Sequence, residues 1–277
     1  AALALGELLI GGVMRIPVAI GIIVVMTLII LGGLRRTHLV NMVIVTITLA
    51  ALLMYFFESV NLKTPMIKVE SDGFDFFEVC ALIFVGYTGY GRIATMGEEI
   101  KHPRRNIPIA MYITLTLSGL LYAGVAWAEL KQTVPPQIWH IGMVTALLGV
   151  LLNLILGLSR ILFAMGRRND MPKIFGQLSA NNQPTWAVFG VTVMVCLLCL
   201  LGDIKLAWSF SAFTVLIYYA ICNLAALQLN AKQLLYSHGL GYIGLISCLF
   251  LAFWVDWKAW FSGLLLIGLG LFAGGLA

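Results

Sequence analysis

The chain has 277 residues, of which 61 % are hydrophobic and 10 % are charged, and its mean hydropathy is +0.99. A soluble domain carries roughly 25 % charged residues, so this composition offers too little polar surface to cover a globule in water. The net charge of +5 does not indicate a nucleic-acid partner, because the basic residues lie in short clusters between long apolar runs. Runs of about 18–20 residues are long enough to cross the hydrocarbon core, whereas the strands of a membrane β-barrel alternate over about 10 residues. The composition therefore predicts an all-α polytopic protein in a lipid bilayer.

The apolar runs predict one partial helix and nine full membrane spans. The partial helix covers about 1–13, and the spans cover about 17–34, 39–57, 75–100, 107–128, 140–166, 185–201, 206–229, 240–255 and 257–276. The opening "AALALGELLI" has no initiator methionine and no basic segment, so it indicates a start inside a helix rather than a signal peptide. We expect 1–277 to form a single transmembrane domain.

Basic residues are concentrated in alternate loops. The loops at 35–38, 101–106, 167–184 and 230–238 hold Arg35, Arg36, Lys101, Arg104, Arg105, Arg167, Arg168, Lys173 and Lys232. The intervening loops are acidic or mixed in charge. Because Lys and Arg are retained on the cytoplasmic side, the four basic loops are predicted to be cytoplasmic. The short polar loops favour a bacterial inner membrane.

The five cysteines all lie in apolar runs, and Cys196 and Cys199 form a CxxC pair. A zinc site of this type needs a second such pair or flanking histidines, which the sequence lacks. We therefore predict no metal and no cofactor.

Three glycines interrupt the middle of the predicted span 75–100. Gly86, Gly89 and Gly91 are separated by Tyr87, Thr88 and Tyr90. Each glycine costs a helix interior about 1 kcal/mol relative to alanine, and unwound backbone at membrane depth persists only where it lines a cavity or is packed in protein. A helix interrupted at mid-membrane indicates a transporter binding site. The alternative is that the glycines simply permit close packing of helices.

Charged residues follow the glycines directly. Arg92 costs at least about 2.5 kcal/mol at this depth unless it is paired or hydrated. Arg92, Thr95 and Glu99 fall on one helix face, which predicts an Arg92–Glu99 pair facing the bundle or the cytoplasmic path. We expect a gating or coupling role for Arg92, Glu98 and Glu99, and an interfacial position is the alternative for the two glutamates.

Three stretches resemble the amino acid permeases of the amino acid–polyamine–organocation superfamily. "GYTGYGRIATMGEEIKHPRRNIP" (86–108) is similar to the glycine-broken sixth helix of these permeases and the segment that follows it. "LSRILFAMGRRNDMPK" (158–173) resembles the end of their eighth helix, and "VNMVIVTITLAALL" (40–53) resembles their fifth helix. The resemblance implies a LeuT-type fold with five plus five inverted helices and two trailing helices. This chain would supply the end of the third helix through the twelfth.

The resemblance also implies site residues. In the family, the first helix binds the substrate carboxylate through backbone N–H groups, and the sixth binds the α-amino group through carbonyls. It assigns amine-side contacts to a short segment and makes Tyr90 a candidate for lining or gating the pocket. The segment comprises Phe84, Val85, Gly86, Tyr87, Thr88 and Gly89.

Two positions depart from the family pattern. Gly91 stands where many relatives have an acidic residue, and Thr48 stands where proton-coupled relatives often have a lysine. A threonine hydroxyl does not titrate at physiological pH, so lysine-based proton coupling is not expected. Exchange, uniport, or coupling of a proton or sodium ion through another group stays open, and Thr48 is kept as a coupling candidate.

Two further spans carry polar stripes. Ser211 and Thr214 begin a stripe in 206–229, where a substrate contact and an interhelical hydrogen bond are the alternatives. Asn153 lies on a stripe with Gly149 in 140–166. We predict that Asn153 bonds across helices, with a substrate contact as the alternative.

These observations predict a secondary transporter that moves amino acids by alternating access, with the substrate at the broken helix. The aromatic residues Phe84, Tyr87 and Tyr90 favour a neutral amino acid; a permease for polyamines or other organic cations is the alternative within the superfamily. No Walker-type stretch is present, so gradients or exchange would supply the energy. An enzyme is not predicted, because no paired catalytic residues lie within the spans. A non-transporting structural or sensory subunit is the alternative from another class.

Overall fold

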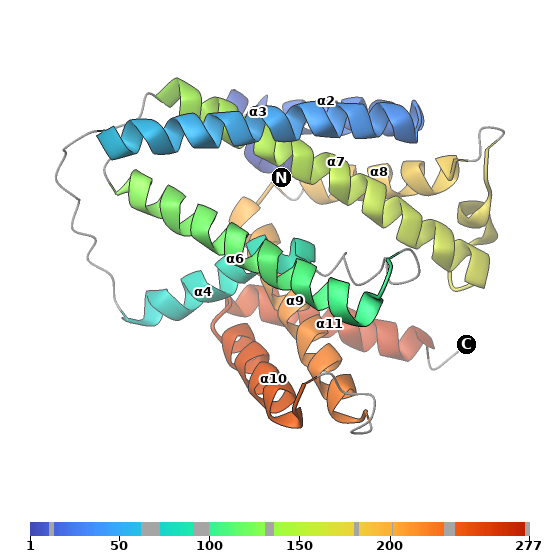
Figure 1. Ribbon diagram of the computed structural model, residues 1–277. Helices are drawn as coiled ribbons and strands as arrows, with labels where there is room; N and C mark the ends of the chain where they lie inside the picture. The colour runs from blue at the N-terminus through green and yellow to red at the C-terminus, as the bar shows by residue number, and fades with distance from the viewer. Residues whose placement is uncertain are drawn as a thin grey trace. The chain divides into compact units, whose positions relative to one another are not determined.

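The structure is a computed structural model that describes residues 1–10, 14–61, 73–90, 100–130, 136–179, 183–200, 202–229 and 236–274. These residues form helices joined by turns and contain no strand (Figure 1). The helices are α1 (Ala2–Leu9), α2 (Arg15–Leu31), α3 (Leu34–Asn61), α4 (Gly73–Tyr87), the 3₁₀ turn η2 (Thr88–Tyr90), α6 (Pro103–Glu129), α7 (Pro136–Arg168), the 3₁₀ turn η3 (Lys173–Gly176), α8 (Thr185–Cys199), α9 (Ile204–Leu227), α10 (His238–Phe253) and α11 (Trp257–Gly274).

Each predicted apolar segment has a helical counterpart in the same order. Within the described residues, four helical segments are long and apolar enough to cross a membrane: Leu34–Glu58, Pro103–Glu129, Trp139–Arg168 and Ile204–Leu227. The apolar helices α2 and α8 are shorter, with 17 and 15 residues, and α10 and α11 meet at a bend of 119°. Fewer described helices therefore reach full spanning length than the nine predicted spans. At 1.5 Å per residue, α2 is about 26 Å long, slightly less than the hydrocarbon thickness. The architecture is that of a polytopic helical membrane protein.

The span predicted over 75–100 is the one that differs most. The α-helix ends at Tyr87, and the backbone tightens into the 3₁₀ turn η2 over Thr88–Tyr90. Residues 91–99 lie outside the described part of the chain. The interruption occurs within the stretch where the glycines predict it.

The chain divides into two compact units. Unit 1 comprises Ala1–Met66 and Val125–Gly202, and unit 2 comprises Ile67–Gly124 and Asp203–Ala277. Unit 1 thus contains α1, α2, α3, α7 and α8. Unit 2 contains α4, most of α6, and α9 to α11.

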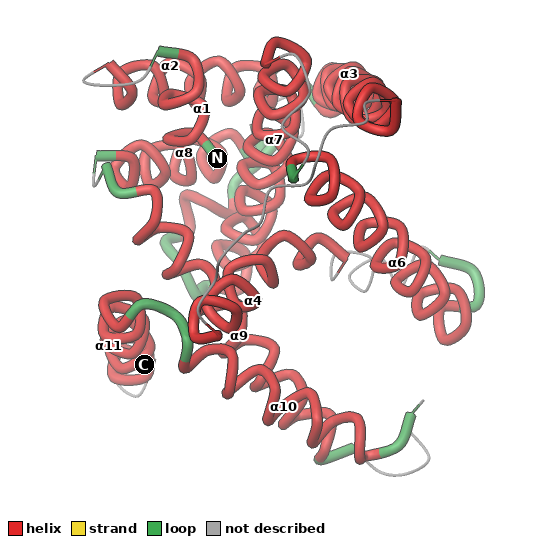
Figure 2. The backbone as a smooth tube through the Cα atoms, turned by 90° about the vertical axis from the view of Figure 1, so that its left-hand side faces the viewer, coloured by secondary structure: helices red, strands yellow, loops and turns green. Residues whose placement is uncertain are grey.

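In unit 1, α3 and α7 lie side by side in opposite directions (Figures 1 and 2). At one end the rings of Tyr55 and Trp139 stack with centroids 4.9 Å apart. Farther along, Thr48 meets Thr145, and the last pair is Asn41 with Asn153. Glycines on α7 allow this closeness: a Cβ at Gly149 would lie 3.2 Å from Ile44 Cγ2, and one at Gly142 would lie 3.4 Å from Ala51 Cβ.

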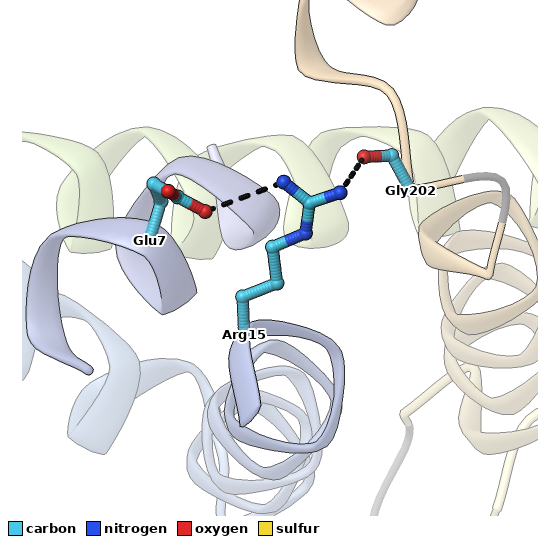
Figure 3. A network of polar contacts seen from close by, with 3 residues as sticks. All are labelled: Glu7, Arg15 and Gly202. Carbon is cyan, nitrogen blue, oxygen red and sulfur yellow. Dashed lines mark hydrogen bonds and ion pairs between the residues drawn. The ribbon is translucent and has the colours of Figure 1, made fainter. Parts of the chain in front are cut away.

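Arg15, at the start of α2, joins three parts of unit 1. Its guanidinium Nη1 lies 3.4 Å from Glu7 Oε2 on α1, and its Nη2 donates to the Gly202 carbonyl beyond α8 at 3.0 Å (Figure 3). Gly202 has φ +72°, a backbone conformation that glycine adopts without strain. The side chain therefore connects the ends of α1, α2 and α8.

In unit 2, α4 packs against α9 and α10 through small and aromatic side chains. The buried cluster comprises Ala81, Ala212, Phe213, Leu216, Ala220, Cys248, Ala252, Val255 and Ala259. Trp208 Nε1 on α9 donates to the Leu82 carbonyl at 3.0 Å, and Lys205 Nζ lies 3.3 Å from Glu78 Oε1. These contacts fix α4 on α9 just before the point where α4 ends.

Candidate functional site

The candidate site is the end of α4. The last four carbonyl groups of an α-helix have no partner within the helix, and in α4 they belong to Phe84, Val85, Gly86 and Tyr87. Two of the four accept side-chain hydroxyls. Thr88 Oγ1 donates to the Val85 carbonyl at 2.8 Å, and Tyr122 Oη on α6 donates to the Gly86 carbonyl at 2.9 Å. The interruption of α4 thus presents carbonyl oxygens to groups that donate hydrogen bonds.

These oxygens carry the partial negative charge of a helix C-terminus. The last turn of α4 contains no basic side chain that would neutralise it. A cationic group with several N–H donors, such as an ammonium, matches the charge and hydrogen-bonding capacity of this end.

Phe84 and Val85 point their side chains into the protein interior. Both pack against the buried cluster of unit 2, and the ring of Phe84 meets Tyr219 edge to face at 5.6 Å. Their backbone carbonyls are therefore the groups that they can offer to a ligand.

The two described glycines of the break lie on exposed backbone. Among the described residues, no atom lies within 4 Å of a Cβ built on Gly89. A Cβ on Gly86 would lie 3.4 Å from Tyr122 Oη. Within the described part of the chain, a side chain at 89 therefore meets no neighbour, whereas Gly86 adjoins a tyrosine.

Tyr122 was not predicted from the sequence. Its ring meets that of Tyr87 edge to face at 5.0 Å and 74°. A tyrosine inside an apolar span needs a partner for its hydroxyl, and this requirement was the available signal. The sequence could not show that the partner is the backbone of α4.

The other predicted residues of this region fall partly outside the described chain. Arg92, Glu98 and Glu99 lie in 91–99, and of Tyr90 only the backbone, in η2, is described. Their predicted roles remain predictions.

Ser211 and Thr214 lie on α9, between Trp208 and Tyr219, both of which contact α4. The Thr214 hydroxyl donates to the Phe210 carbonyl of its own helix at 2.9 Å. The structure thus brings both residues onto the helix that supports α4.

Asn153 and Thr48 lie in unit 1, at the interface of α3 and α7. Asn153 Nδ2 donates to Asn41 Oδ1 at 2.8 Å and to the Gly149 carbonyl at 2.9 Å, which confirms the predicted bond across helices. Thr48 Oγ1 lies 2.9 Å from both Thr145 Oγ1 and the Ile44 carbonyl. Both side chains are thus engaged within this interface.

Comparison with known proteins identifies the family. Residues 125–274, more than half of the chain, match the family described as "Amino acid permease". An uncharacterized transporter of Mycobacterium tuberculosis is 30 % identical over 94 % of this chain and 65 % of its own length. The inner membrane transport protein YbaT of Escherichia coli is 26 % identical over 76 % of this chain and 55 % of its own length.

A plant protein, the chloroplastic cationic amino acid transporter 6 of Arabidopsis thaliana, is 24 % identical over 75 % of this chain and 42 % of its own length. The chain thus spans 65 % or less of the length of these three relatives. The family match, the named transporters and the bundle of apolar helices agree. The chain belongs to the amino acid permease family of the amino acid–polyamine–organocation superfamily of membrane transporters.

Proposed function

We propose that the protein is a secondary transporter that moves an amino acid across the membrane by alternating access, and that the α-amino group of the substrate binds at the end of α4. The observation that carries this proposal is the end of α4 at Tyr87, where the carbonyls of Val85 and Gly86 accept hydrogen bonds from the hydroxyls of Thr88 and Tyr122. An ammonium group carries three N–H donors and a full charge, so it is a stronger partner for these oxygens than a neutral hydroxyl.

The residues around the break favour a neutral amino acid. In its described part, the break is flanked by the aromatic rings of Tyr87 and Tyr122 and by the hydroxyl of Thr88. A second amine, as in a polyamine or a cationic amino acid, requires a carboxylate or a further set of carbonyls. The plant relative is named a cationic amino acid transporter, so cationic substrates belong in the test.

Thr48 stays a proposed gating or coupling residue, but not as a proton carrier. Its hydroxyl is held between Thr145 and the Ile44 carbonyl, and it does not titrate in the physiological range. Exchange, uniport, and coupling of a proton or sodium ion through another group are the open alternatives for the mechanism.

The proposed location is a bacterial inner membrane, with the loops at 35–38, 101–106, 167–184 and 230–238 in the cytoplasm. The bacterial relatives support the location, and the positive charge of these loops supports the orientation. In a background without native cysteines, a membrane-impermeant maleimide should label Asp203→Cys in intact cells and leave Arg168→Cys unlabelled. The reverse labelling would refute the orientation.

The experiment for the substrate site measures ligand-induced stabilisation of the full-length protein in nanodiscs. The melting temperature is recorded with each of the twenty amino acids, with putrescine and with spermidine. We expect one or a few amino acids to raise it. Gly89→Leu should abolish this shift, because it adds a large side chain at the break, and should leave the protein folded.

The matched control is Gly21→Leu on α2, where a new Cβ also meets no described atom within 4 Å. It should retain the ligand-induced shift. A normal shift in Gly89→Leu would remove the break as the site, and a shift with polyamines alone would favour the organic-cation alternative. Binding without uptake into proteoliposomes would favour a sensory subunit.

A further inference from the structure

We propose that Tyr122 is a positioning residue of the substrate site, whose hydroxyl holds the Gly86 carbonyl in the direction that receives the amine of the substrate. This inference rests on the proposed function. It adds a residue from α6 to a site that the sequence assigned to the broken helix.

The accepting oxygen is the carbonyl oxygen of Gly86 at the end of α4. Gly86 is the last residue but one of α4, so its carbonyl has no partner within the helix. Tyr122 Oη donates to it at 2.9 Å, an ordinary hydrogen-bond length. Tyr122 therefore supplies the interrupted backbone with a hydrogen-bond donor from a separate helix.

The ring of Tyr122 lies against α4 at Gly86. A Cβ built on Gly86 would lie 3.4 Å from Tyr122 Oη and 3.5 Å from Cε2. These are ordinary van der Waals distances, so the tyrosine ring packs directly against α4 at Gly86 while its hydroxyl reaches the carbonyl.

The ring of Tyr122 also contacts the ring of Tyr87. Tyr87 meets it edge to face at 5.0 Å, and a Cβ at Gly119 would lie 3.6 Å from the Tyr87 hydroxyl. Gly119 and Tyr122 lie on the same face of α6, three residues apart. The two tyrosines therefore hold each other between α6 and the end of α4.

The Gly86 carbonyl can accept more than one hydrogen bond. A carbonyl oxygen has two lone pairs, so a hydroxyl on one leaves the other for an ammonium N–H. The comparison with Val85 separates two roles. The donor to Val85 is Thr88, three residues along the same segment, and it moves with the break. The donor to Gly86 comes from a separate helix and ties the direction of this carbonyl to α6.

The test is Tyr122→Phe in the full-length protein, reconstituted into proteoliposomes. Uptake of each of the twenty radiolabelled L-amino acids is measured first in the wild type, and KM and the maximal rate are then compared. We expect Tyr122→Phe to raise KM about fivefold, the effect of one hydrogen bond, with the maximal rate unchanged. Tyr112→Phe is the control, because it removes a hydroxyl from the same helix that bonds Tyr236 instead; it should leave KM unchanged.

The outcomes separate this inference from the proposed function. Wild-type protein that takes up none of the amino acids overturns both. Normal wild-type uptake with an unchanged or lowered KM in Tyr122→Phe overturns the positioning role alone. A fall in the maximal rate without a change in KM also overturns it, because a loss of folded protein has that signature.

Discussion

The hydroxyls of Thr27 on α2 and Thr192 on α8 lie 2.9 Å apart, and both residues are buried in unit 1. Each hydroxyl also lies 2.8 Å from a carbonyl of its own helix, that of Ile23 for Thr27 and that of Val188 for Thr192. A hydroxyl has one hydrogen, so one threonine donates across the interface while the other donates to its own helix. The pair thus joins α2 to α8 and satisfies both donors.

Thr192→Val is expected to lower the free energy of unfolding by about 1 kcal/mol, because valine keeps the shape and removes the bond between helices. The measurement is thermal unfolding in detergent. Thr46→Val is the control, since this exposed hydroxyl donates to the Met42 carbonyl of its own helix. Thr27→Val combined with Thr192→Val should cost about as much as either single change. Equal losses for Thr192→Val and Thr46→Val would contradict a contribution from the interface.

Arg15→Met is expected to cost about 1.5 kcal/mol of stability, whereas Glu7→Gln should cost less than about 0.5 kcal/mol. The 3.4 Å pair with Glu7 is largely exposed, and such pairs contribute little. The 3.0 Å bond to the Gly202 carbonyl is partly buried and involves a charged donor, which makes it the stronger contact. The melting temperatures of both variants show which of the two contacts contributes more to stability. A larger fall in melting temperature for Glu7→Gln than for Arg15→Met would contradict this prediction.

Gly166→Ala is expected to lower stability by about 2 kcal/mol, as overpacking does. A Cβ at this position would overlap the Gly176 backbone nitrogen and would lie 2.8 Å from the Phe175 carbonyl carbon. Backbone atoms cannot move aside as a flexible side chain can. Gly239→Ala is the control, because the nearest atom to its Cβ would be Ser237 Oγ at 3.7 Å. The comparison again uses thermal unfolding, and equal melting temperatures for the two variants would show that the η3 turn shifts without cost.

Ser209→Ala is expected to raise stability by about 1 kcal/mol. The Ser209 hydroxyl is fully buried in α9, and its oxygen has no hydrogen-bond partner among the described residues. Removing an unsatisfied buried polar group relieves its desolvation cost. Ser262→Ala should give no such gain, because its hydroxyl donates to the Lys258 carbonyl at 2.9 Å. A lower melting temperature in Ser209→Ala would mean that water or an ion satisfies this hydroxyl.

The sequence predicted where the helices lie, because apolar runs end at residues with a clear local role. The span predicted over 206–229 corresponds to Ile204–Leu227, which begins after Asp203, whose carboxylate accepts from the Leu206 amide at 3.0 Å. The glycines at 86 and 89 likewise indicated the interruption that follows Tyr87. These signals are local, so one sequence is enough to detect them.

Contacts between distant helices could not be predicted in the same way. The polar stripe of Asn153 indicated a bond across helices, and Asn41 is likewise a polar residue in an apolar span, but the sequence could not show that these two residues, 112 positions apart, are partners. The contact of Tyr122 with the α4 backbone could not be predicted, because an isolated tyrosine in an apolar span fits many environments equally well. Periodicity gives the face of a helix, and only the fold gives the neighbour of that face.

The contacts between α3 and α7 recur along both helices in matched, opposite order, from Tyr55 with Trp139 through Thr48 with Thr145 to Asn41 with Asn153. A slide of α3 by one turn would separate all three pairs together. We therefore expect α3 and α7 to move together as one rigid body. Any motion that opens a path through the protein has to move this helix pair as a whole or rotate other helices around it.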